Sequence, residues 1–482
     1  MKRILAELAH KVGVEPELER ALELARHYGS FCWSMNVGTF DNPSIERCLA
    51  RRLSVEAGPF KRSAVEQRDA LHVISEPYLT GGHTRLMEKL AGMHECQPDL
   101  MITRAAQAAV VERLLNHFSR IHRADAVPTA IERIHYMVGI MAGYKRVVLS
   151  LHPDDITAVL ACMLVKDISN TRIYLVNHAD HGFTFGSAAA DVYFELSSYG
   201  RRVDEQKAIV GQKSFLGIPL AQVNGNVGLR HGGVQEDELL FLSAGADTKF
   251  RPRRGADIRP LIATLLKRFP KAQFVVIGPN ARRDSWWWPL MIRFRGRLRL
   301  MRHLPFDEYS QVTKRASFYV DSHPFPGGTA FAEQLIAGQR CVGLVSPFQG
   351  YSPAEKLKSV DAEGVVAAVL SYSVREEVTQ QVASVNGLDS VKARYLGCLY
   401  EARYTENLMD TYCTWTGDIA FMQAEREGRN VDISAEAFSG IAAALPSIAR
   451  DVFLRLRFGK KLKLVAKLLM HRFGRLAGER SR

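Results

Sequence analysis

Pro324–Glu333, PFPGGTAFAE, is the most informative segment of this 482-residue chain. It stands between a short β-rich run, SFYVDS, and an amphipathic run typical of a helix. Two glycines at such a junction predict a tight turn, because glycine adopts backbone conformations that are closed to other residues. Ligands of parallel sheets lie outside the carboxyl ends of the strands. The stretch therefore predicts an α/β sheet with a ligand site at this turn.

Strand-like and helix-like runs alternate on both sides of the turn. The β-rich runs are LHVISE, DLMIT, RVVLSL and TRIYLVNH in the first half, and LLFLSAG, AQFVVIGP, RLRLMRHL, SFYVDS and RCVGLVS in the second. An amphipathic segment follows most of them, which predicts βαβ units and parallel sheets. The sequence thus predicts two doubly wound, Rossmann-like domains.

We expect four segments along the chain. They are a helical N-terminal extension (1–66) with breaks at Gly29 and GTFDNP, a first α/β domain (67–235), a second α/β domain (236–400) and a helical tail (401–482).

Composition indicates a globular protein of a reducing compartment. Apolar residues make up 47% and charged residues 24%, which is ordinary for such proteins. The longest apolar run, ITAVLACMLV, is too short to span a bilayer, and the N-terminus lacks the apolar region of a signal peptide. Seven scattered cysteines without a CxxC pair argue against a disulfide framework or structural zinc. We expect a cytoplasmic protein.

The net charge of +13 is concentrated at the C-terminus. Residues 450–482 hold eleven Lys or Arg and two Asp or Glu, interleaved with apolar residues at near-helical spacing. This pattern is typical of a basic helix on an anionic membrane surface, and it predicts a peripheral location on the inner face of the cell membrane. The alternative is a helix that packs back onto the domains. Arginines beside WWW are not accompanied by an RNA-binding motif, so no nucleic-acid partner is expected.

The glycine turn and a nearby strand end form a candidate anion site. Gly327 and Gly328 let the backbone approach a pyrophosphate, and the helix behind them offers free N–H groups. Thr329 adds a hydroxyl, and Glu333, one turn further, suits the hydroxyls of a ribose. Lys249 follows the first strand of the same domain, where it can neutralise a diphosphate leaving group. The alternatives are a plain turn and a solvated lysine.

A third strand end on the same edge suits a nucleobase. Main-chain groups near His303 and Leu304 can bind a base edge, and Tyr309 can stack on the base. A tyrosine at an ordinary helix start is the alternative.

Residues 240–350 resemble the donor domain of GT-B glycosyltransferases. The order TKFRP, VVIGP, LPFDEY, DSHPFPGGTAFAE and AG is similar to the O-GlcNAc-transferase-like group. The resemblance implies two Rossmann-like domains that face a cleft, with a UDP-linked sugar as the expected nucleotide-sugar in the second. The matching positions are Lys249 at the diphosphate, Tyr309 in place of a base-stacking histidine, Gly327, Gly328 and Thr329 in the phosphate turn, and Glu333 at the ribose.

One departure from related enzymes bears on the stereochemistry. Retaining GT-B enzymes carry two glutamates eight residues apart around this turn, and the first would fall on Phe325. The resemblance therefore favours inversion, which needs a base for the acceptor. The chain has no DxD motif, so we expect neither a metal nor a permanently bound cofactor.

His83 is the candidate for that base or for positioning the acceptor. It follows a tight turn at Gly81–Gly82, and a glycine-histidine pair at a similar turn occurs in O-GlcNAc-transferase-like enzymes. Its imidazole titrates near neutral pH. A helix-capping histidine is the alternative.

The run YLVNHADHGFTFG supplies further acceptor-side or sugar-side candidates. His178 and His181 follow a strand, and Asp180 can orient one of them. An HxxH pair resembles a metal pair, but no further ligands accompany it. Asp154 and Asp155 start a helix, and capping accounts for both.

These features predict a glycosyltransferase of the hexosyltransferase type that uses a nucleotide-sugar donor in surface polysaccharide or lipopolysaccharide synthesis. The acceptor is expected to be a glycan, a lipid-linked glycan or a protein. A protein glycosyltransferase, a sugar-nucleotide epimerase and a non-catalytic membrane-associated scaffold are the alternatives. The scaffold would bind no nucleotide.

Overall fold

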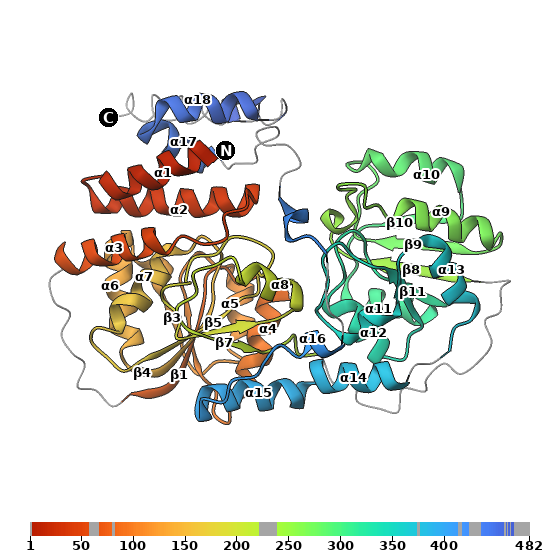
Figure 1. The fold of residues 1–482 in the computed structure, drawn as a ribbon, viewed down its shortest axis with the longest axis horizontal. Coiled ribbons are helices and arrows are strands. Elements are labelled where there is room, and N and C mark those ends of the chain that lie inside the picture. The colour runs from red at the N-terminus through yellow and green to blue at the C-terminus, as the bar shows by residue number, and fades with distance from the viewer. Residues whose placement is uncertain are drawn as a thin grey trace. The chain divides into compact units, whose positions relative to one another are not determined.

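The computed structural model divides into two compact units, and each is described by itself (Figure 1). The first unit comprises Met1–Phe194, Arg202–Ser214 and Met422–Arg482, and the second comprises Glu195–Arg201 and Phe215–Phe421. The structure describes residues 2–56, 67–79, 82–220, 239–373, 376–412, 417–423 and 435–456, together with 459, 461–462 and 464–466.

The first unit is built on a seven-stranded sheet of order β3-β2-β1-β4-β5-β6-β7. Its strands are β1 (Arg68–Ile74), β2 (Asp99–Ile102), β3 (Ile121–Arg123), β4 (Tyr144–Ser150), β5 (Arg172–Val176), β6 (Val192–Glu195) and β7 (Gln212–Phe215). The neighbours from β3 to β6 pair in parallel. The winding reverses between β1 and β4, and such a switch point is where open α/β sheets bind ligands.

The helices that follow these strands come mostly from amphipathic runs of the first half, while α7 forms from the apolar run ITAVLACMLV. They are α4 (Gly82–Ala91), α5 (Ala108–Leu114), α6 (Ala130–Met141), α7 (Ile156–Val165) and α8 (Ser198–Asp204). Side chains of α6 and α7 are buried together with those of β1, β4 and β5 in one apolar core.

Five terminal helices are stacked on one side of this unit, as Figure 1 shows. They are α1 (Lys2–Val14), α2 (Leu18–Met35), α3 (Pro43–Glu56), α17 (Ala435–Ala444) and α18 (Pro446–Arg455). The predicted break at Gly29 is wrong, since this residue lies inside α2. A Cβ at Gly29 would lie 2.5 Å from the ring of Phe185, so glycine serves close packing there.

The second unit is built on a six-stranded sheet of order β10-β9-β8-β11-β12-β13, and its pairings are parallel. Its strands are β8 (Leu240–Ala244), β9 (Gln273–Ile277), β10 (Leu298–Met301), β11 (Phe318–Val320), β12 (Cys341–Leu344) and β13 (Lys358–Ser359). Its helices are α9 (Arg259–Arg268), α10 (Trp288–Arg293), α11 (Phe306–Arg315), α12 (Thr329–Ile336), α13 (Ala362–Leu370), α14 (Glu376–Asn386), α15 (Leu388–Glu401) and α16 (Met409–Tyr412). The prediction of two doubly wound parallel sheets is confirmed.

Of the predicted C-terminal tail, α17 and α18 belong to the first unit, whereas residues up to Phe421 belong to the second. Val452 and Leu456, two of the apolar residues expected to face a membrane, are buried in the core of the first unit. An ion pair of 3.2 Å joins Arg3 of α1 to Asp451 of α18. Residues 467–482, the basic end of the tail, lie outside the described residues. No helix in the described ranges is long and apolar enough to cross a membrane.

Candidate functional site

The glycine turn of the second unit is organised by a buried carboxylate that the sequence analysis did not single out. Asp321 directly follows β11, and its Oδ1 accepts hydrogen bonds from the amides of Ser322 (2.8 Å) and Gly327 (2.7 Å). Its Oδ2 pairs with Nζ of Lys358 at 2.8 Å, and both side chains are almost fully buried. A Cβ at Gly327 would lie 2.4 Å from Oδ1 of Asp321. Only glycine fits this position without displacing the carboxylate.

The turn leads into α12 with free backbone donors. Gly328 has a φ of +52°, which favours glycine, and α12 begins at Thr329. The amides of Gly328 and Thr329 make no hydrogen bond to a described residue. Together with the positive end of the helix dipole, such donors suit an anion. Thr329 and, one turn on, Glu333 are both partly exposed beside these amides.

Lys249 is held by the same turn. It lies in the short 3₁₀ segment Asp247–Phe250 after β8, and its Nζ donates to the carbonyl of Pro326 at 3.0 Å. Its own carbonyl accepts from the amide of Phe325 at 3.2 Å. Burial lowers the pKa of Lys249, although the nearby Asp321 acts in the opposite direction. The lysine and the glycine turn are therefore adjacent.

The candidate base-binding residues lie at the start of α11. Tyr309 is half-buried, packs against the core of the unit and accepts a hydrogen bond from Nε2 of Gln334 in α12 at 3.2 Å. Burial raises the pKa of its phenol. His303 is exposed and Leu304 is half-buried in the preceding loop. This contact between α11 and α12 connects the tyrosine with the helix that carries Glu333.

In the first unit, charged side chains gather at the switch point between β1 and β4. Arg104, which follows β2, donates to Oδ1 of Asp154 at 2.6 Å and to Oε1 of Glu76 at 3.2 Å. Burial opposes ionisation of Asp154, but His152 and Arg104 hold its pKa well below the usual range. The pKa of Glu76 is also lowered, because hydrogen bonds from Tyr78 and Arg104 outweigh the effect of burial.

His152 lies beside this pair on the loop after β4. Its Nδ1 is 2.5 Å from Oδ1 of Asp154, and its amide donates to Oγ of Ser75 at 2.8 Å. The ring is about 30% exposed. Nε2 of His152 makes no hydrogen bond to a described residue.

His83 and His178 are stacked on each other in the same region. Their ring centroids are 5.2 Å apart with an interplanar angle of 21°. Nε2 of His83 lies 2.8 Å from the carbonyl of Glu76, so this nitrogen carries the proton. Burial lowers the pKa of His83, and it lowers the pKa of His178 to about 3. Gly81 of the predicted turn lies outside the described residues, whereas Gly82 begins α4.

His181 contacts the N-terminal helices rather than His83. Its ring lies 5.0 Å from that of Trp33, which also meets His152 edge-on at 6.2 Å. Asp180 is buried, and its Oδ1 is 3.8 Å from Nδ1 of His181. Trp33 of α2 therefore contacts both His181, an acceptor-side candidate, and His152, which the sequence did not single out.

Helix capping was expected for both Asp154 and Asp155, and the structure shows it for Asp155 only. Asp155 caps α7 by accepting from the amide of Ala158 at 3.3 Å, as expected. Asp154 instead bonds His152 and Arg104, so capping does not account for it. Sequence reasoning missed Arg104 and His152 and assigned Asp154 to capping, although all three follow predicted strand ends. Lys249 was chosen because it follows the end of a strand, and the same criterion would also have identified these residues.

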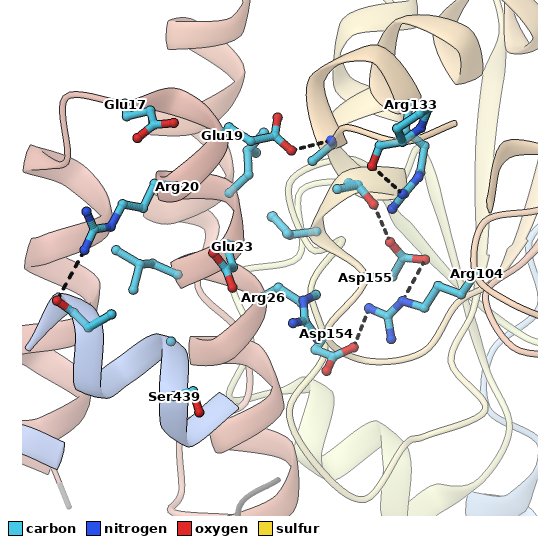
Figure 2. A pocket seen from close by; sticks show the side chains of 18 residues that line it. Glu17, Glu19, Arg20, Glu23, Arg26, Arg104, Arg133, Asp154, Asp155 and Ser439 are labelled. Atoms are coloured by element: carbon cyan, nitrogen blue, oxygen red, sulfur yellow. Dashed lines mark hydrogen bonds and ion pairs between the residues drawn. The ribbon is translucent and has the colours of Figure 1, made fainter. Parts of the chain in front are cut away.

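A pocket of about 690 Å³ adjoins this cluster within the first unit. Figure 2 shows its charged lining from α2 and the starts of α6 and α7, with the uncharged Ser439 from α17 and with Arg104 joined to Asp154 and Asp155. Oε1 of Glu19 accepts from the amide of Ala130 at 2.5 Å and thereby caps α6. Most charged groups of the pocket already have protein partners of this kind.

No metal site is apparent in the part of the chain that the structure describes. No three His, Cys, Asp or Glu side chains there gather closely enough to hold an ion.

Comparisons with solved structures identify the fold. HepE from Anabaena in complex with UDP matches with a TM-score of 0.51 at 9% identity, over 69% of this chain and 100% of its own. A glycosyltransferase from Rickettsia africae matches with a TM-score of 0.50 at 9% identity, over 69% of this chain and 98% of its own. The chain has the GT-B fold.

A wider match and two negative results complete the comparison. An O-GlcNAc transferase mutant from Thermobaculum terrenum matches over 83% of this chain and 77% of its own, with a TM-score of 0.48 at 15% identity. No protein-family model matches the GT-B chain described here, and no curated protein sequence matches it either.

Proposed function

We propose that this GT-B protein is a glycosyltransferase that takes its sugar from a UDP-sugar bound to the second unit. The observation that carries the proposal is the junction of Lys249 with the Gly327–Thr329 turn, where a cation and free amides lie together at the switch point of a parallel sheet. HepE, which shares the fold, has been crystallised with UDP and with UDP-glucose.

In this proposal the second unit stabilises the departing nucleotide. The amides of Gly328 and Thr329 bind the diphosphate, and Lys249 offsets the charge that develops on it. Glu333 holds the ribose, and Tyr309 with the main chain at His303 and Leu304 holds the base. A lysine and a helix N-terminus would take the place of a metal ion.

The first unit would supply the acceptor side. We assign His83, His178 and His181 to the acceptor or the transferred sugar, with Asp180 buried beside His181. Inversion is proposed because Phe325 stands where a retaining enzyme would carry its first glutamate. A glycan of a surface polysaccharide or a lipopolysaccharide is the proposed acceptor. None of the described cysteines forms a disulfide, in keeping with the proposed cytoplasmic location.

The proposed membrane contact is limited to the end of the tail, from Leu462 onward. Leu462 and Val465 are exposed beyond α18, and the basic residues that follow them complete an amphipathic pattern.

Calorimetry with UDP, GDP, CMP and TDP tests the donor site. We expect UDP to bind, and Lys249→Ala to weaken it by about 10- to 100-fold, since one charge-assisted contact is lost. Lys267→Ala is the matched control, because Lys267 is an exposed lysine at the end of α9 in the same unit. If no nucleotide bound to the wild type, the proposal would fail and a non-catalytic scaffold would be favoured.

A further inference from the structure

Four histidines of the first unit, His83, His152, His178 and His181, form the imidazole cluster. The two ring nitrogens of His152 have clearly different surroundings. Nδ1 of His152 bonds the buried carboxylate of Asp154 at 2.5 Å, while Nε2 makes no hydrogen bond to a described residue. The carboxylate accepts only, so Nδ1 carries the proton and Nε2 presents a lone pair. This is the arrangement of a base that a carboxylate holds in one tautomer.

Neighbouring side chains hold the pair of His152 and Asp154 in place. Arg104 binds Asp154 at 2.6 Å, and the amide of His152 is tied to Ser75 at the end of β1. Glycine at position 29 brings α2 close to this loop, since a Cβ there would lie 2.9 Å from Cβ of Asp154. Trp33 of the same helix covers one edge of the imidazole. The base is therefore preorganised by contacts from three elements, namely the ends of β1 and β2 and the helix α2.

His83 lacks these features. Its hydrogen-bonded nitrogen faces the neutral carbonyl of Glu76, and its ring is stacked on a second imidazole, that of His178. A carboxylate partner stabilises the imidazolium that forms when a base takes a proton, whereas a neighbouring imidazole does not. His83 is better suited to positioning the acceptor.

We propose that His152, oriented by Asp154 and Arg104, is the proton acceptor of the transfer reaction. The inference rests on the proposed function. The acceptor hydroxyl oxygen forms a bond to C1 of the sugar while its proton moves to Nε2 of His152. The bond between C1 and the diphosphate oxygen breaks, and its electron pair leaves with UDP. Asp154 and Arg104 are positioning residues in this step.

Donor hydrolysis and azide rescue test the proposal without knowledge of the natural acceptor. With UDP-glucose or UDP-N-acetylglucosamine as the donor, water needs a base to attack C1, whereas the azide anion carries no proton and needs none. We expect His152→Ala to slow UDP release in water by about 10²- to 10⁴-fold. Azide should restore UDP release and yield the glycosyl azide. Asp154→Asn should lose part of the rate and be rescued likewise.

Matched controls separate this inference from the proposed function. UDP affinity should stay within about twofold in His152→Ala, because the donor residues belong to the second unit. His117→Gln, which alters a half-buried histidine outside the cluster, should hydrolyse the donor at the wild-type rate. Hydrolysis that is unchanged in His152→Ala, or lost without azide rescue, would overturn the assignment. The assignment would also be overturned if the wild type bound UDP but hydrolysed neither donor, because an oriented base should activate water.

Discussion

At the scale of single residues, Asp321 explains why position 327 is a glycine. The carboxylate occupies the space of a Cβ and binds the amide of the same residue. The sequence predicted the turn from its two glycines, but the buried acid that shapes it could not be inferred. Its role depends on Lys358, which reaches Asp321 from another strand.

Gly327→Ala is expected to disturb both stability and binding. The added methyl group would lie 2.4 Å from Oδ1 of Asp321, so the carboxylate or the turn must move. We expect a loss of about 1–3 kcal/mol in the free energy of unfolding, together with weaker UDP binding. Denaturant unfolding and calorimetry measure the two effects. Gly139→Ala, at an exposed position of α6 with open space around it, should be neutral or stabilising by up to about 1 kcal/mol. Equal effects of the two substitutions would contradict this explanation.

At the scale of elements, most apolar runs were predicted as strands, whereas several short strands with polar or partly buried residues were not. The runs that form β1, β5, β8 and β9 are buried along most of their length, which gives a clear pattern. By contrast β3 and β13 are short and only partly buried, and β7 begins with two exposed polar residues. Pairing with a neighbouring strand, which the sequence does not display, decides such segments.

The α18 helix provides the prediction at this scale. Ile448 is buried in the core of the first unit, whereas Leu454 of the same helix is 61% exposed. We expect Ile448→Ala to lower the free energy of unfolding by about 2–5 kcal/mol and Leu454→Ala to change it by less than about 0.5 kcal/mol. Denaturant unfolding of both variants measures this difference. If the two changed stability equally, α18 would not be packed as described.

At the scale of the whole molecule, the sequence predicted two parallel sheets but not how the chain ends are grouped. The first and last helices belong to one compact unit, joined by contacts such as the one between Arg3 and Asp451. Hydrophobic periodicity along the sequence does not indicate which residues pair when they are as far apart as Arg3 and Asp451. In the acceptor region, likewise, His83 and His178 were predicted separately, and only the structure brings their rings together.

Buried histidines should make both units sensitive to acid. Burial lowers the pKa of His178 to about 3 and of His323 to about 4, so both stay neutral in the folded protein at pH 5. The unfolded chain, with a histidine pKa of about 6.5, binds more protons there, so stability falls as the pH drops below about 6.5. Thermal unfolding at pH 7 and pH 5 should show this loss. It should be smaller in His323→Asn, while the exposed His10→Asn should behave as wild type. A midpoint of thermal unfolding that is the same at pH 7 and pH 5 would contradict the lowered pKa of these two histidines.

The most direct test of the central claim is amide hydrogen exchange of the full chain with and without UDP. The proposed diphosphate site consists of the free amides of Gly328 and Thr329, next to Lys249. Exchange in peptides that span 322–331 should therefore slow when UDP binds, and Lys249→Ala should reduce this protection at equal nucleotide concentration. UDP binding that protects other peptides and leaves 322–331 unchanged would contradict the account.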